Sequence, residues 1–375
     1  MSSSLTDDHK RIVKSIIENL GDKLSPGLLV FLVKKHLGLS ISVDEASDFM
    51  RSLGSKRIGS LVPIAKEPKS RDLKQICLGI INESKVLLDS EGGPLLISPD
   101  SNDRSTLTPI LFLSDLHIGE VIEVNGREIF NIAIAEKRLA SIVDQFIVSG
   151  ELRGYSVSEC VVILGGDIID GELIYPAQSF NTESHGFDQV RVAVSMIWKQ
   201  LMRLQELFGV VRVYCVPGNH GRSSKLHHQM TNWDNVLYFG LQLMAKLSSV
   251  RRDLFESGEG IEVSTPLQMW MDFKVREWNV HIRHIGVTQP VSAGPAKRMM
   301  TWLDNHNADL LFYGHYHSPE MYSIGHRRVF KNGALPPGND YSEMLGYVDS
   351  PGQWMIGVTD RNSVEFAKIL VPNVV

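Results

Sequence analysis

Cysteine is scarce in this sequence of 375 residues, which contains only Cys77, Cys160 and Cys215. The three cysteines are odd in number, widely separated and without C-x-x-C spacing. This pattern argues against a disulfide framework and against a cysteine-based zinc site. We therefore expect a protein of a reducing compartment, the cytoplasm.

Long hydrophobic runs and a strong excess of one charge are also missing. The apolar runs, such as Cys160 to Leu164, are far shorter than a membrane span or the hydrophobic region of a signal peptide, so we expect no membrane association. The net charge is only -5, so any contact with nucleic acid must rest on a local patch. Hydrophobic residues make up 43% of the chain, which is enough for a sizeable core.

The N-terminal residues predict a small, mainly helical accessory domain. Apolar periodicity over residues 8–54 indicates three short helices with tight turns, similar to a helix-turn-helix, and Ser42 and Glu45 form a capping box for the third. Two β-like runs at residues 75–81 and 86–88 favour a winged variant. A polar stretch then predicts a boundary that separates residues 1–105 from a second domain, residues 106–375.

A basic cluster follows the third predicted helix. Residues 55–74 hold six basic and two acidic side chains, a local net charge of +4. The basic residues are Lys56, Arg57, Lys66, Lys69, Arg71 and Lys74. The cluster is either a solvated linker, as most charge runs are, or a contact for nucleic acid.

From Ile110 onward, short buried strands alternate with longer helices, the pattern of a layered α/β domain. We predict strands at residues 110–114, 160–164, 210–216, 269–275, 279–284 and 309–313, with shorter strands continuing to Val371. Helices are predicted at residues 131–150, 190–208 and 296–305.

Five polar clusters stand at the ends of these predicted strands. They are Asp115-Leu116-His117, Gly166 to Asp170, Gly218-Asn219-His220, His284, and Gly314 to His317. Taken singly, each has an ordinary explanation as a helix cap, a core histidine or a turn. Loops at strand ends are, however, where α/β sheets carry their sites, so we expect the clusters to act together.

The order D-x-H, G-D-x-x-D, G-N-H, a lone histidine and G-H-x-H resembles the calcineurin-like metallophosphoesterase superfamily over residues 109–375. The resemblance implies a β-sandwich flanked by helices and a centre of two divalent ions that hydrolyses phosphate esters. Carried over by position, it implies that Asp115, His117, Asp167 and His317 hold one ion. Asp167, Asn219, His284 and His315 would hold the other, with Asp167 as the bridge.

The ligand types also limit the metal. A set of carboxylate, imidazole and amide donors without thiolate suits Mn, Fe or Zn, and disfavours a soft ion such as Cu(I). We expect two Mn²⁺ ions, with Fe, Zn or Ni as alternatives.

His220 matches the family's general acid or phosphate-contacting histidine, and Asp170 matches the carboxylate that orients it. We also expect Arg222 and Asn219 to contact the substrate phosphate, although Arg222 is as readily explained as a surface or capping residue. His281 competes with His284 for the lone-histidine role. The two lie three residues apart, on opposite faces of a strand, and we favour His284 because a loop follows it.

The sequence says less about the substrate. Protein Ser/Thr phosphatases of the superfamily carry an arginine after the second aspartate and a G-N-H-E motif, whereas this chain has Gly171 and Gly221. The run GGDIID is more similar to DNA-repair nucleases of the SbcD and Mre11 type, which have an acidic residue where Gly221 stands. The runs Gly218 to Arg222 and Lys331 to Ala334 resemble phage or prophage members, which would place the protein in a host cytoplasm.

These features favour a nuclease or phosphodiesterase that acts on DNA, with the N-terminal domain as its nucleic-acid-binding accessory. The alternative is a small-molecule phosphatase or nucleotide phosphodiesterase, whose N-terminal domain is a lid or an oligomerisation module. A homodimer stays open as the quaternary state.

Overall fold

The computed structural model describes residues 105–175, 178–252, 260–285, 295–338 and 350–373. Residues 1–104 hold almost all of the predicted N-terminal domain and its basic cluster, and they lie outside the described ranges. The two-domain division therefore stays a prediction. Within the described ranges, no helix is both long and apolar enough to cross a membrane.

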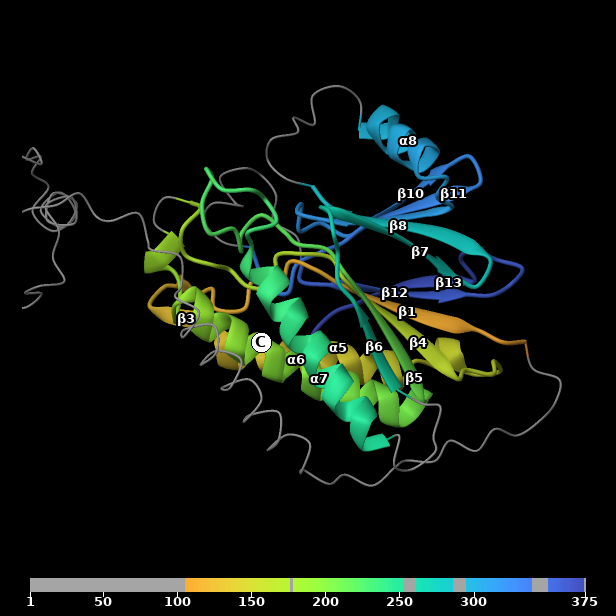
Figure 1. Cartoon of the computed structure of the whole chain (residues 1–375), viewed down its shortest axis with the longest axis horizontal. Coiled ribbons are helices and arrows are strands. Elements are labelled where there is room, and N and C mark those ends of the chain that lie inside the picture. Colours follow the sequence, from red (N-terminus) through yellow and green to blue (C-terminus); the bar gives the residue numbers. More distant parts are fainter. Residues whose placement is uncertain (1–104, 176–177, 253–259, 286–294, 339–349, 374–375) are drawn as a thin grey trace, which may run out of the picture. The chain divides into compact units, whose positions relative to one another are not determined.

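The first sheet has six strands in the order β13-β12-β1-β4-β5-β6 (Figure 1). Its parallel part consists of β1 (Thr108–Leu113), β4 (Glu159–Leu164), β5 (Val210–Cys215) and β6 (Gly260–Ser264). Beyond β1, the strands β12 (Gln353–Val358) and β13 (Phe366–Leu370) are added in antiparallel pairings. Because β1, β4 and β5 end at the same edge, the loops that follow them lie together.

The second sheet has five strands in the order β10-β11-β9-β8-β7. Its middle strands run parallel and are β8 (Trp278–His284), β9 (Leu310–Gly314) and β11 (Arg327–Lys331). The edge strands β7 (Trp270–Val275) and β10 (Glu320–Ile324) pair antiparallel. A separate hairpin joins β2 (Ile122–Val124) and β3 (Arg127–Phe130).

Helices cover the outer faces of the two sheets (Figure 1). The first sheet carries α5 (Ile132–Ile147), α6 (Gly186–Phe208) and α7 (Trp233–Arg252), and the second carries α8 (Pro295–Asn305). Within the described ranges, short 3-10 helices at Gly150–Leu152 and Gln178–Phe180 lie in the loops. The predicted sandwich flanked by helices is thus confirmed.

Strand β1 shows how the sequence builds the layers. All six of its residues are buried, and successive side chains point to opposite faces. Ile110 and Phe112 pack between the two sheets, whereas Leu111 and Leu113 pack under the helices. A strand buried on both faces is continuously apolar rather than alternating, which is why it was recognisable in the sequence.

Every predicted strand and helix from Ile110 to Tyr313 is present, with ends that shift by a few residues. The sequence analysis missed α7, β6 and the hairpin of β2 and β3. Within α7, the buried stripe of Leu237, Leu241 and Met244 is blurred by the exposed Phe239 and Leu247, and Gly240 interrupts the helix pattern.

We predict that Phe312→Ala destabilises this domain by about 3 to 5 kcal/mol, the usual cost of emptying a buried aromatic site. Phe312 is fully buried between the sheets, stacked on Phe330 with ring centroids 5.0 Å apart. The matched control is Phe239→Ala on α7, where the side chain is 50% exposed and the change should stay within about 0.5 kcal/mol. Urea unfolding measures both, and equal losses would contradict the assignment of the core.

Candidate metal centre

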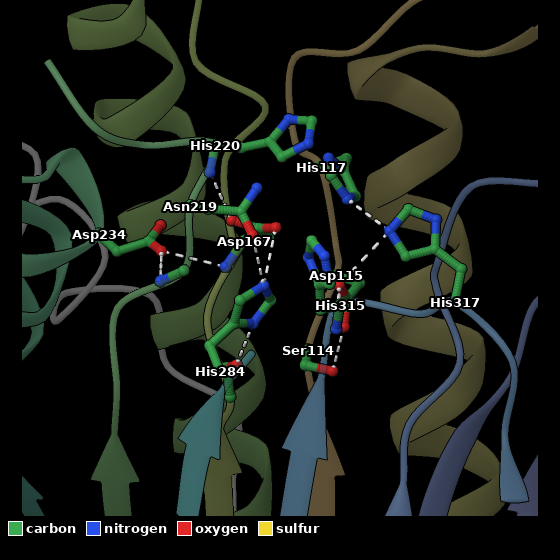
Figure 2. A network of polar contacts seen from close by, with 12 residues as sticks. Ser114, Asp115, His117, Asp167, Asn219, His220, Asp234, His284, His315 and His317 are labelled. Carbon is green, nitrogen blue, oxygen red and sulfur yellow. Dashed lines mark hydrogen bonds and ion pairs between the residues drawn. The ribbon is translucent and has the colours of Figure 1, made fainter. Parts of the chain in front are cut away.

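The five predicted motifs converge at one end of the two sheets, where β1, β4, β5, β8 and β9 finish (Figure 2). The parallel pairings place the last residues of neighbouring strands side by side, Leu113 with Leu164 and Leu164 with Cys215. His284 likewise pairs with Gly314 in the second sheet. Loops distant in sequence are therefore brought to one place by strand register.

The first group of donor side chains is Asp115, His117 and His317. The Nε2 atoms of His117 and His317 are 3.1 Å apart, and Nε2 of His317 is 3.4 Å from Oδ1 of Asp115 (Figure 2). Asp115 and His117 are buried, whereas His317 is partly exposed. This group opens toward solvent on the side of His317.

The second group is Asp167, Asn219, His284 and His315. Nε2 of His284 lies 3.0 Å from Oδ2 of Asp167 and 3.2 Å from Oδ1 of Asn219. The rings of His284 and His315 meet edge to face, and the potential ligand atoms of Asp167, His284 and His315 lie within 4.8 Å of one another. All seven predicted ligands are thus brought together.

These separations fit cation binding. Two ligand atoms that are each about 2.1 Å from one ion, at right or tetrahedral angles, lie about 3.0 to 3.4 Å apart. The contacts across the two groups span the same range, from 3.0 to 3.4 Å. Two imidazole nitrogens that face each other at 3.1 Å, as in His117 and His317, also need a proton or a cation between them. The donor atoms therefore fit divalent ions.

The charges in the centre favour a cation as well. Burial acts to lower the pKa of His117, but the hydrogen bond to Asp170 and the negative charges of Glu120, Asp170 and Asp167 together raise it to about 10. Burial also acts to lower the pKa of His284. The charge of Asp167 and the hydrogen bond to it are the main causes that raise this pKa to about 9. The neighbouring histidines hold the pKa values of Asp115 and Asp167 below the ordinary value despite burial. Metal ions placed here would meet the same negative field that stabilises the imidazole protons.

The backbone is strained at the same residues. Eight non-glycine residues in the described ranges have positive φ, and five of them are predicted ligands: Asp115 (53°), His117 (43°), Asp167 (50°), His315 (95°) and His317 (55°). Positive φ is unfavourable for residues with a side chain and persists only where the surroundings enforce it. Such strain is concentrated at functional sites, which supports a shared role for these five residues.

The motifs need glycines because their loops approach one another closely. Gly166, Gly218 and Gly314 each precede a predicted ligand. A Cβ at Gly166 would lie 2.6 Å from the backbone nitrogen of Gly218, and one at Gly314 would lie 2.5 Å from Oδ2 of Asp115. A Cβ at Gly218 would overlap Asp167. The loops can therefore pack closely enough to share ligands only with glycine at these positions.

Asp234, at the start of α7, was missed by the sequence analysis. Its buried carboxylate accepts hydrogen bonds from the backbone N–H groups of Gly218 (2.8 Å), Asp167 (3.1 Å) and Ile168 (3.3 Å). Burial and the nearby charge of Asp167 raise the pKa of Asp234 to about 6. This side chain ties the loops after β4 and β5 together, a role with no signal in the sequence other than a polar residue at a helix start.

Asp170 orients two histidines rather than one. Its Oδ1 lies 2.9 Å from Nδ1 of His220 and 3.1 Å from Nδ1 of His117. The two rings are edge to face with centroids 4.4 Å apart. With Nδ1 engaged in each ring, Nε2 is the nitrogen available for the roles predicted from the sequence, metal binding by His117 and substrate contact by His220.

Arg222 lies next to this group, and its Nε donates to the backbone oxygen of Asn219 over 3.1 Å. The guanidinium thus supports the loop that carries Asn219, and its contact with a substrate phosphate stays a prediction. The residue is partly buried.

His281 lies away from the centre, on the face of β8 opposite to that of the inter-sheet core. Its Nδ1 is 2.6 Å from Oδ1 of Asp272, whose Oδ2 is 2.9 Å from Nδ1 of His306, and the two imidazole rings are stacked. These contacts tie β7 and β8 to the end of α8. Between the two competing histidines, the structure thus brings His284 to the predicted ligands.

No curated protein matches this chain, but several solved structures are similar to it. Zinc-complexed Vps29 from Entamoeba histolytica is 11% identical over 70% of this chain and 97% of that chain, with a TM-score of 0.31. A predicted phosphoesterase from Streptococcus pneumoniae is 13% identical over 71% and 98%, with a TM-score of 0.30. An archaeal phosphodiesterase is 12% identical over 70% and 99%, with a TM-score of 0.32. At this level the similarities carry no argument about function.

A family model gives the stronger result. The model described as calcineurin-like phosphoesterase matches residues 108–319, more than half of the chain. The matched range begins with β1 and ends after the G-H-x-H motif, so it contains all seven predicted ligands. This chain therefore belongs to the calcineurin-like phosphoesterase family and is a metal-dependent phosphoesterase.

Proposed function

We propose that this enzyme hydrolyses phosphodiester bonds in nucleic acid, most simply DNA, at a centre of two Mn²⁺ ions. The observation that carries the chemistry is the convergence of seven oxygen and nitrogen donors in two adjacent groups. Asp115, His117, Asp167 and His317 hold one ion in this proposal, and Asp167, Asn219, His284 and His315 hold the other. Two bound ions would activate a water for attack at phosphorus and stabilise the charge that develops there.

The protein's own residues set the geometry of this reaction. Asp167 would bridge the two groups in this proposal. Its Oδ2 faces His284, its Oδ1 accepts the backbone N–H of His220 over 2.7 Å, and its own backbone N–H donates to Asp234. His117 is held by Asp170, so that its Nε2 faces His317. These side chains are nearly all buried, which keeps their positions rigid before a substrate arrives.

His220 acts as the general acid in this proposal. Asp170 fixes the ring through Nδ1, so that Nε2 is the nitrogen that would give a proton to the leaving oxygen. The side chain is 23% exposed, in contrast to the buried ligands, and is therefore accessible to a substrate. Gly171, which follows Asp170, has a φ of 73° and a Cβ there would overlap the backbone oxygen of His220. An arginine of the protein-phosphatase type does not fit at this position.

The choice of nucleic acid rests on the sequence of the N-terminal region. The six basic residues between Lys56 and Lys74 are the strongest local positive charge in an otherwise acidic chain. A polyanion needs such a patch to approach a protein with net charge -5. The reducing cytoplasm is the compartment that fits this role. If the protein is phage-encoded, this is the cytoplasm of the host.

The bridging role predicts that Asp167→Asn abolishes turnover and lowers metal content, because a neutral amide cannot bridge two cations as a carboxylate does. Elemental analysis and a phosphodiester reporter measure the two effects. Asp272→Asn is the control, since this carboxylate bonds histidines outside the centre and its loss should leave two metals bound. Normal turnover of Asp167→Asn with two metals bound would remove the bridge.

His220→Ala should leave both metals bound and slow hydrolysis by about 10² to 10⁴, the usual effect of losing a general acid. The loss should be much smaller for a reporter with a good leaving group than for an alkyl ester, because only the poor leaving group needs the proton. Equal losses for both esters would indicate that His220 binds the phosphate instead.

Deleting residues 1–105 should weaken DNA binding and processing but spare a small phosphodiester reporter, since all predicted ligands lie beyond residue 110. Full-length affinity should fall steeply with salt, and replacing Lys56 and Arg57 by Gln should flatten that slope. A truncated enzyme that degrades DNA as well as the intact one would favour the small-molecule alternative, with the N-terminal region as a lid or an oligomerisation module.

A further inference from the structure

Tyr175 lies on the loop between β4 and α6 and contacts the predicted ligand Asn219. We propose that Tyr175 is a positioning residue: its hydroxyl holds the Asn219 amide so that the amide oxygen, and not the nitrogen, faces the second metal position. This inference rests on the proposed two-metal function and assigns a residue that the family motifs do not include.

The contacts of the Asn219 side chain fix its orientation. Nδ2 of Asn219 donates to the Tyr175 hydroxyl oxygen over 2.9 Å, and Oδ1 is turned toward Nε2 of His284 at 3.2 Å. Asn219 is 3% exposed, so water offers little alternative to these partners. A flipped amide would point N–H groups at the metal position, and only the oxygen can bind a cation.

The Tyr175 loop is itself anchored to the catalytic histidine. Oε1 of the buried Gln178 accepts the backbone N–H groups of Ile174 (2.9 Å) and Tyr175 (3.1 Å). Nε2 of Gln178 donates to the backbone oxygen of Asp170 and lies 3.3 Å from Nδ1 of His220. The hydroxyl of Tyr175 is thus placed by the same loop that carries Asp170.

The ring of Tyr175 has separate contacts. Its centroid is 4.9 Å from that of His220, and the Nζ atom of Lys225 lies 5.3 Å from it. Phenylalanine would keep both ring contacts and lose only the hydroxyl. Tyr175→Phe is therefore a clean test of the hydrogen bond to Asn219.

Loss of a partner that orients a metal ligand usually reduces metal affinity by about 10 to 100-fold. We therefore expect Tyr175→Phe to weaken binding of one of the two Mn²⁺ ions by that factor and to leave the other unchanged. Activity should be reduced at limiting Mn²⁺ and restored by excess Mn²⁺. The KM for a phosphodiester reporter at saturating metal should stay close to that of the wild type.

The experiment is titration calorimetry of the full-length metal-free protein with Mn²⁺, together with activity at limiting and saturating Mn²⁺. Tyr155→Phe is the matched control, because it also removes one hydroxyl that hydrogen bonds over 2.9 Å, but to Glu365. Thermal unfolding checks that both variants are folded.

Any of three results for Tyr175→Phe would overturn the positioning role. These are two unchanged Mn²⁺ affinities, equal losses in both affinities, or an activity defect that excess Mn²⁺ does not restore. The wild-type titration separates this failure from a failure of the proposed function. A wild type that binds fewer than two Mn²⁺ ions contradicts the two-metal proposal itself, whereas a two-site wild type with an unaffected variant contradicts only the role of Tyr175.

Discussion

The whole centre depends on two buried carboxylates that require positive charge. Asp115 and Asp167 are 0% and 1% exposed, and the raised pKa values of His117 and His284 keep these two imidazoles protonated at pH values where a free histidine is neutral. Burying a carboxylate is costly unless a positive partner is close. The site is thus built for a strong local positive charge, and the donor separations and donor types agree with divalent metal ions as its source.

The surrounding fold works to bring these charges close. Strand register in the two sheets places the motif loops side by side, glycines let the loops approach, and Asp234 links the loops after β4 and β5 through three backbone N–H groups. The strained φ values of five predicted ligands are a cost that this packing sustains. The same packing therefore stabilises the sandwich and holds the predicted ligands in place.

Much of this could be predicted from the sequence because the signals were local. Continuous apolar runs indicated β1 and β4, and the polar clusters after the strands, in an order that resembles the calcineurin-like family, indicated the ligands. Asp234, Gln178 and Tyr175 could not be predicted, because their roles arise from contacts between loops that only the folded chain brings together. The substrate was equally hidden, since the metal ligands are shared across a family with many substrates. The choice between His281 and His284 could be argued from strand alternation, which puts them on opposite faces, together with the loop that follows His284.

The central claim is that the two donor groups form one dinuclear centre with Asp167 shared between them. Electron paramagnetic resonance of the protein loaded with two equivalents of Mn²⁺ tests this claim most directly, because ions about 3.5 to 4 Å apart are magnetically coupled. We predict the spectrum of a coupled Mn²⁺ pair at full loading. A spectrum of isolated Mn²⁺ ions at full loading, or saturation at one ion per chain, would contradict the account.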